Sequence, residues 1–141
     1  MSNQTRNSRK RQAILDVLRS SDAHPSAEML YAALKPEWPD LSLGTVYRNI
    51  SCFLQNNQIS CVGTVNGHER YDARTDPHSH FICSTCGRIE NVDLPDLASG
   101  VVYPRVEKML GGCRVLAHQL TFTGVCAACV RREKGITSCP F

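Results

Sequence analysis

The chain has 141 residues, a formal net charge of +3 and 42% hydrophobic residues, enough for one compact domain or two very small ones. No stretch approaches the roughly 18 uninterrupted apolar residues of a membrane helix, and the first residues are polar, so we expect a cytoplasmic protein without membrane contact. Eight cysteines would suit a disulfide scaffold only in an exported protein, so metal or redox chemistry is the first hypothesis for them.

Three short helices are expected first. Residues 9–20 repeat apolar side chains at helical spacing. Ser26 has the position of an N-cap for a second helix that ends before Pro36, and Ser42 has the same position for a third. The polar side of the third helix carries Thr45, Tyr47, Arg48 and Asn49.

A β-hairpin is expected next, because short β-like runs at 59–65 and 69–72 flank Asn66 and Gly67, a strong two-residue turn signal. Three helices followed by a hairpin describe a winged helix, whose third helix enters the major groove of DNA. The candidate DNA-binding residues are then Thr45, Tyr47, Arg48 and Asn49. A small helical domain without a DNA function is the alternative, and periodicity alone does not separate the two.

The second half of the chain changes to a strand pattern. Strands are expected at 78–84, 88–94 and 113–123, with a helix at 96–110. The whole is therefore expected to be α+β, a winged helix followed by a small α/β unit with an antiparallel three-stranded sheet. Such a sheet buries little by itself, which favours dimerisation. We place the boundaries at 1–73 for the DNA-binding domain, 74–80 for a hinge and 81–141 for a dimerisation and zinc-binding domain.

Two C-x-x-C pairs carry the most specific chemical signal. They consist of Cys83, Cys86, Cys126 and Cys129. Four soft thiolates in a tetrahedron select Zn(II) in a closed structural site. The alternative is a thiol oxidoreductase that uses the C-x-x-C pairs directly, or a metal-storage module. The other four cysteines are expected to be inert, because no cationic cluster lowers their pKa. They are Cys52, Cys61, Cys113 and Cys139.

A second cluster offers nitrogen and oxygen ligands. His78 and His80 are two residues apart on an expected strand, so both imidazoles point to the same face. Asp72 ends the hairpin and His24 lies in the loop before the second helix. Mixed imidazole and carboxylate ligation suits Fe(II), Mn(II), Co(II) or Zn(II).

Five motifs occur in a fixed order along the chain. They are His24-Pro-Ser-Ala-Glu, Thr45-Val-Tyr-Arg-Asn-Ile, Arg70-Tyr-Asp, His78-Ser-His-Phe-Ile-Cys-Ser-Thr-Cys-Gly and Gly124-Val-Cys-Ala-Ala-Cys. Their order and spacing resemble those of the ferric uptake regulator (Fur) superfamily over nearly the whole chain. The resemblance implies a dimeric, metal-dependent transcription factor that is not an enzyme. It also implies structural zinc at the four clustered cysteines and a regulatory Fe(II) or Mn(II) site at His24, Asp72, His78 and His80.

The residue at position 72 points to one branch of that superfamily. With Asp72 at this position the chain resembles the peroxide-responsive (PerR) branch, which has an Asp there, whereas iron-sensing members commonly have a Glu. The fifth ligand of that branch, an Asp, falls on Asn91, whose neutral carbonyl oxygen is a weaker ligand for a hard cation. Glu90 and Asp93 are the alternatives nearby. His118 resembles a ligand of an additional site in some relatives, although its apolar neighbours favour a core or interface histidine.

The resemblance predicts a homodimeric repressor of palindromic operator DNA. Metal would join the two domains and hold two recognition helices at the operator spacing. Hydrogen peroxide, the only small-molecule substrate expected, would oxidise His24 or His78 at bound Fe(II) and release the DNA. The rival within the same class is an iron, manganese or zinc sensor that responds to metal loss alone, and Asn91 keeps that reading open.

Overall fold

The computed structural model describes residues 3–94, 100 and 102–135. The chain divides into two compact units, Met1–Thr75 and Asp76–Phe141. Among the described residues, no helix combines the length and apolar character needed to cross a membrane. The finer domain and hinge boundaries expected from the sequence stay a prediction.

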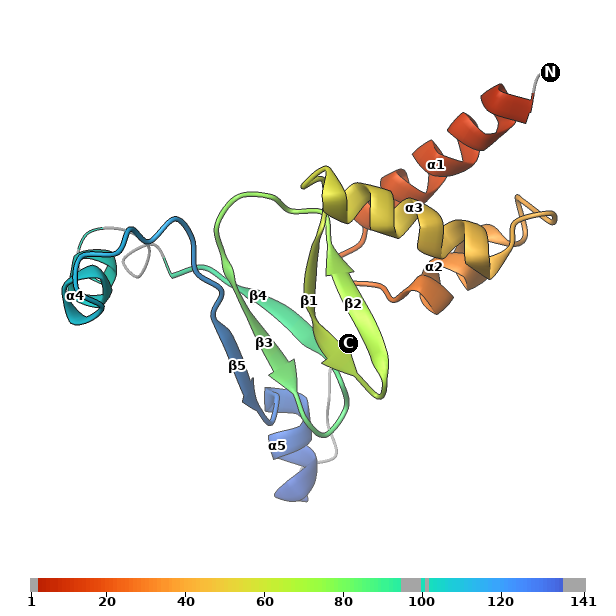
Figure 1. Cartoon of the computed structure of the whole chain (residues 1–141). Coiled ribbons are helices and arrows are strands. Elements are labelled where there is room, and N and C mark those ends of the chain that lie inside the picture. Colours follow the sequence, from red (N-terminus) through yellow and green to blue (C-terminus); the bar gives the residue numbers. More distant parts are fainter. Residues whose placement is uncertain (1–2, 95–99, 101, 136–141) are drawn as a thin grey trace. The chain divides into compact units, whose positions relative to one another are not determined.

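The first unit is the expected winged helix (Figure 1). Its elements, in chain order, are α1 (Asn3–Ser20), α2 (Ala27–Leu34), α3 (Leu43–Gln55), β1 (Ser60–Val65) and β2 (His68–Asp72). The helices enclose one apolar core, and the helix α1 begins earlier than the sequence pattern indicated.

Local signals explain why these elements begin and end where they do. The Ser26 side chain accepts a hydrogen bond from the Met29 backbone N–H (3.2 Å), and Ser42 accepts one from Thr45 (3.1 Å), so both predicted N-caps are confirmed. The turn between β1 and β2 has positive φ at Asn66 (52°) and Gly67 (79°). These are the dihedral signs of the type I′ turn that the dipeptide favours.

The second unit contains a three-stranded sheet and two short helices. Its elements are β3 (Ser79–Cys83), β4 (Ile89–Val92), α4 (Val102–Met109), β5 (Thr121–Gly124) and α5 (Ala127–Glu133). The strand order is β4-β3-β5. The α+β fold class is confirmed, but the sheet is mixed, because β4 is antiparallel to β3 and β5 is parallel to it.

The last strand of this unit is much shorter than expected. Of the strand expected at 113–123, only the part from Thr121 forms β5. The short strand β3 offers β5 pairing partners only from His80 onward. Pro104 lies in the first turn of α4, where its missing N–H has no intrahelical partner to lose, so the helix accommodates it. Residues 96–99, the part of the expected helix that precedes Gly100, lie outside the described residues.

The helix α5 was not predicted from the sequence. The signal for it is a run of good helix formers after Cys126, its N-cap residue, followed by Gly135 with φ of 71° at the end. None of the eight residues of α4 is buried. Large apolar side chains in and after α4 are exposed in the single chain: Met109, Leu110 and Leu116.

Candidate metal centres

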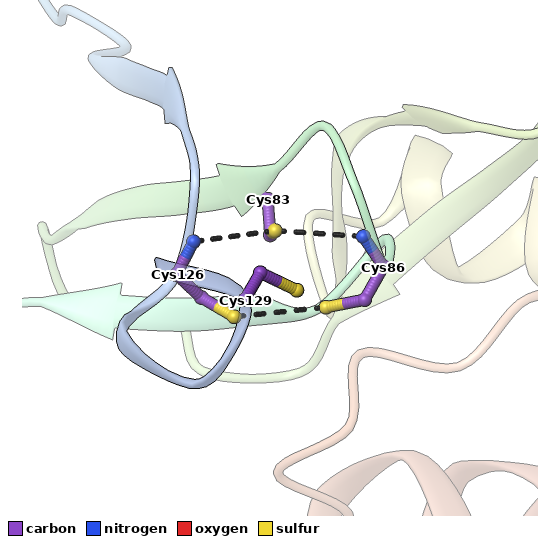
Figure 2. Close-up of side chains that lie close together, drawn as sticks. All are labelled: Cys83, Cys86, Cys126 and Cys129. Atoms are coloured by element: carbon purple, nitrogen blue, oxygen red, sulfur yellow. Dashed lines mark hydrogen bonds between the residues drawn. The ribbon is translucent and has the colours of Figure 1, made fainter. Parts of the chain in front are cut away.

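The four clustered cysteines converge at one edge of the second unit's sheet (Figure 2). Their Sγ atoms all lie within 4.8 Å of one another. Cys83 is the last residue of β3, and Cys126 follows the end of β5 by two residues. Because β3 and β5 are parallel, both carboxyl ends meet at the same edge, and the two C-x-x-C pairs follow them there.

The spacing of the sulfurs fits tetrahedral zinc. The Sγ atoms of Cys86 and Cys126 are 3.7 Å apart. A tetrahedron with Zn–S bonds of about 2.3 Å has edges of about 3.8 Å. Gly87 has φ of 76° and donates its N–H to the Cys83 carbonyl, which closes the turn that brings Cys83 and Cys86 together.

Backbone dipoles stabilise thiolate charge in this cluster. Hydrogen bonds from the N–H groups of Cys126 (3.3 Å) and Cys86 (3.5 Å) to the Cys83 sulfur lower the pKa of Cys83 to about 6. Burial raises the pKa of the Cys129 thiol to about 12. The two backbone N–H groups aimed at the Cys83 sulfur favour its thiolate, and metal binding displaces the remaining thiol protons of the cluster. The donor set and the spacing fit a structural zinc ion.

The other cysteines that the structure describes do not join this cluster. Cys52 and Cys61 are half-buried in the first unit, and burial raises the pKa of Cys61. Cys113 is exposed in the second unit, and Cys139 lies outside the described residues. The predicted inertness of these four thiols stays a prediction, and the raised pKa of Cys61 agrees with it.

A buried histidine and carboxylate lie together in the first unit. His24 Nε2 is 3.3 Å from Asp72 Oδ2, and the two residues are 2% and 8% exposed. The other carboxylate oxygen of Asp72 accepts the Arg74 backbone N–H at 2.8 Å. This arrangement leaves one oxygen and one ring nitrogen facing each other, as in a preformed half of a metal site.

The loop that carries His24 is tied to β2 by hydrogen bonds. His24 has φ of 51°, a conformation that costs an L-residue energy unless its surroundings hold it. The Arg70 guanidinium donates to the backbone carbonyls of Ala23 and His24, and the Tyr71 N–H donates to the Pro25 carbonyl. Arg70 was expected only as part of the Arg70-Tyr-Asp motif, and these contacts were not predicted.

The second unit contributes two imidazoles in contact. The rings of His78 and His80 have centroids 4.5 Å apart. Nδ1 of His78 donates to the Asp76 carbonyl at 2.7 Å, because a carbonyl can only accept. This hydrogen bond leaves the lone pair on Nε2, which is how proteins fix the tautomer of a ligating histidine.

Asn91 lies directly opposite His80 in the β3–β4 register. Opposed residues of antiparallel strands project their side chains to the same face, so Asn91 shares the face of His80. Glu90 is opposite Phe81 and projects to the other face, whereas Asp93 follows the last residue of β4. His24 and Asp72 belong to the first unit, whereas His78 and His80 belong to the second. The assembly of these four residues into one site therefore stays a prediction.

The third helix presents part of the expected DNA-binding set to solvent. Tyr47 is 43% exposed, and the exposed Arg48 donates to the Thr45 hydroxyl at 2.9 Å. Asn49 is buried: its amide accepts from Arg11 Nε and donates to the Thr45 carbonyl, both at 2.9 Å. Asn49 thus ties α3 to α1, and its contact with DNA stays a prediction.

His118 has a partner of its own. Its Nδ1 lies 2.7 Å from the Tyr103 hydroxyl, with the two rings edge to face. The residue is exposed, so a core position within the single chain is wrong, and an interface position stays a prediction.

Comparison with known proteins identifies the family of this chain. Residues 2–122 match the model of the ferric uptake regulator family. The peroxide operon regulator of Bacillus subtilis is 34% identical over 88% of this chain and 83% of its own length. The peroxide-responsive repressor PerR of Staphylococcus aureus is 33% identical over 85% and 79%.

A solved structure shares the fold. The peroxide stress regulator of Campylobacter jejuni superposes with a TM-score of 0.75 at 26% identity, covering 89% of this chain and 93% of its own. The residues that match the family model include the winged helix and most of the second unit, with Cys83 and Cys86 among them. The chain belongs to the ferric uptake regulator family.

Proposed function

We propose that this chain is a metal-dependent transcriptional repressor that senses hydrogen peroxide through oxidation of a histidine ligand. The observation that carries the proposal is the buried contact of His24 with Asp72. An Asp at this position is also the residue by which the chain resembles the peroxide-responsive branch. The names of the two curated relatives, both above 30% identity, support the same branch.

The two metal sites have different tasks in this proposal. Zn(II) at the four cysteines fixes the end of the second unit's sheet permanently, because the closed thiolate set leaves no open position. His24, Asp72, His78 and His80 would hold Fe(II) or Mn(II), and the carbonyl oxygen of Asn91 would be a fifth ligand. Since these residues come from both units, metal binding restricts the motion of the winged helix, and its loss releases it.

The residues around the regulatory ligands perform the positioning. Arg70 holds the His24 backbone and the Asp76 carbonyl orients His78. Bound Fe(II) supplies the reducing chemistry that activates hydrogen peroxide beside these imidazoles. In the net reaction one ring C–H of His24 or His78 becomes C–OH, hydrogen peroxide gives up that oxygen, and the second oxygen leaves as water. The altered ring is a poorer ligand, so the event is a single switch and not turnover.

DNA binding requires two copies in this proposal. A homodimer formed through the second unit would present two α3 helices to a palindromic operator. The exposed apolar side chains of Met109, Leu110 and Leu116 support such an interface, because large exposed apolar surface often marks a protein–protein contact.

The test uses the chain's other histidines as internal controls. Protein loaded anaerobically with Fe(II) is exposed to a slight excess of hydrogen peroxide, and single-oxygen adducts are mapped by peptide mass spectrometry. Adducts are expected on peptides with His24 or His78 and absent from those with His68 and His118. The Mn(II)-loaded protein should show none. Equal oxidation of all histidines, or of none, would contradict the mechanism.

One residue favours a second function of the same class. Asn91 is a neutral donor where the peroxide-responsive pattern has a carboxylate, which weakens binding of a hard cation. A chain with weakened Fe(II) binding would respond to metal supply without peroxide chemistry. In that case DNA binding follows metal concentration, and the histidines stay unmodified after peroxide treatment.

A further inference from the structure

Three side chains from three elements of the winged helix form one hydrogen-bonded chain. The Tyr47 hydroxyl on α3 donates to Glu28 Oε1 on α2 at 2.5 Å. The second oxygen of the same carboxylate lies 3.2 Å from Nδ1 of His68, the first residue of β2. All three side chains remain accessible, Tyr47 with 43% of its surface exposed. Neither metal site uses this cluster.

The carboxylate determines which way the Tyr47 proton points. An ionised carboxylate can only accept hydrogen bonds, so the single O–H of Tyr47 is directed to Glu28. The hydrogen bond from Tyr47 lowers the pKa of Glu28, and the same bond raises the pKa of Tyr47. At neutral pH Glu28 is therefore ionised and Tyr47 is a neutral phenol whose proton is committed. Toward solvent, the phenol oxygen offers lone pairs only.

We propose that Glu28 makes Tyr47 an obligate hydrogen-bond acceptor, so that this tyrosine selects an amino-bearing base edge in the operator. This inference rests on the proposed DNA-binding function of α3. In the major groove the amino donors are adenine N6 and cytosine N4, whereas guanine O6 and N7 and thymine O4 are acceptors. An acceptor-only Tyr47 therefore favours adenine or cytosine on the strand it contacts, and gains nothing from a phosphate oxygen.

The position of Glu28 carries a cost that this role explains. A carboxylate beside a helix that approaches DNA repels phosphate and weakens binding to any sequence. His68 Nδ1 lies beside Glu28 Oε2 and offsets part of that repulsion only when the imidazole is protonated. Glu28 thus lowers non-specific affinity while it sharpens the choice of base, and we assign it as a positioning residue for recognition.

The experiment compares base preferences, which a merely structural residue would not change. Duplexes enriched by the Mn(II)-loaded wild-type protein from a random library define the operator, and all four bases are then measured at each position at stated salt. The variants are Tyr47→Phe, which keeps the ring, and Glu28→Ala, which frees the hydroxyl. Glu69→Gln is the control, because it removes another carboxylate charge that acts on Tyr47 and leaves the Tyr47–Glu28 bond in place.

The expected result is confined to one base position in each half-site. The wild-type protein and Glu69→Gln prefer adenine or cytosine there. Tyr47→Phe loses that preference by about three- to tenfold, the range of one neutral hydrogen bond. Glu28→Ala accepts guanine or thymine at the same position and binds all duplexes more tightly. Unchanged base profiles in both Tyr47→Phe and Glu28→Ala would overturn this inference. Failure of the wild-type protein to enrich any sequence would instead overturn the proposed DNA-binding function.

Discussion

Replacing Arg70 with methionine should weaken the regulatory metal site without touching a ligand. The change keeps much of the side chain's apolar length but removes the guanidinium that holds the carbonyls of Ala23 and His24. Hydrogen bonds from a charged donor contribute about 1.5–3 kcal/mol each, and the two bonds share one half-buried group, so their joint contribution is about 2 kcal/mol. Without them, the left-handed conformation of His24 loses part of its support, although the bond from the Tyr71 N–H to the Pro25 carbonyl still ties this loop to β2.

A loss of about 2 kcal/mol in the metal-ready conformation corresponds to roughly a thirtyfold weaker Kd. The assay is a calorimetric titration with Mn(II) that gives the Kd. The free energy of unfolding of the metal-free protein is measured in parallel. Arg19→Met is the matched control, because Arg19 is an exposed cation in the last turn of α1. An Arg70→Met protein that binds Mn(II) like the wild type would refute the positioning role of Arg70.

Further predictions concern the zinc site, the fifth ligand and the packing of α1. Cys126→Ser should lose the structural zinc, measured as metal content per chain, whereas Cys113→Ser should keep it; equal zinc in both would contradict the assignment. Asn91→Asp should bind Mn(II) at least about tenfold more tightly, since a carboxylate replaces a neutral oxygen beside His80, and an unchanged Kd would place Asn91 outside the site. Asn49→Ala should lower the free energy of unfolding by about 1–2 kcal/mol, because it removes both bonds of a buried amide. Asp40→Asn should destabilise the protein at neutral pH only: Lys10 lowers the pKa of Asp40 below its ordinary 3.8, so its contribution is present above that value and lost as the pH falls through the lowered pKa.

Features encoded by neighbouring residues were predictable from the sequence. The N-caps at Ser26 and Ser42 and the turn at Asn66 and Gly67 depend on the chemistry of a few adjacent residues, and the structure confirms them. Strand periodicity predicted that His78 and His80 share one face; the structure places their rings 4.5 Å apart, although His78 precedes the first residue of β3.

Features that depend on distant pairing were not. The parallel pairing of β5 with β3 involves strands separated by a long connection, and the alternation of side chains is the same in parallel and antiparallel strands. The cysteines contained the missing information. If Cys83 and Cys126 share one ion, the strands that lead into them must end at the same edge, which requires parallel strands.

Tertiary contacts also decide roles that residue type leaves open. Asn49 was expected at the DNA because it lies on the polar side of α3, yet Arg11 and the Thr45 carbonyl occupy its amide. In the sequence, Glu28 looks like an ordinary acidic residue in the first turn of a helix. Only its contact with Tyr47 indicates a role in recognition. Such long-range hydrogen bonds leave no periodic signal in the sequence.

The central claim is that oxidation of a ligand histidine switches DNA binding. It is tested most directly by following both quantities in the same Fe(II)-loaded, operator-bound sample after peroxide is added. The account predicts that the fraction of chains oxidised at His24 or His78 rises in step with the fraction of DNA released, and that adding fresh Mn(II) does not restore binding. DNA release without histidine oxidation, or full recovery on adding metal, would contradict it and indicate a sensor of metal supply.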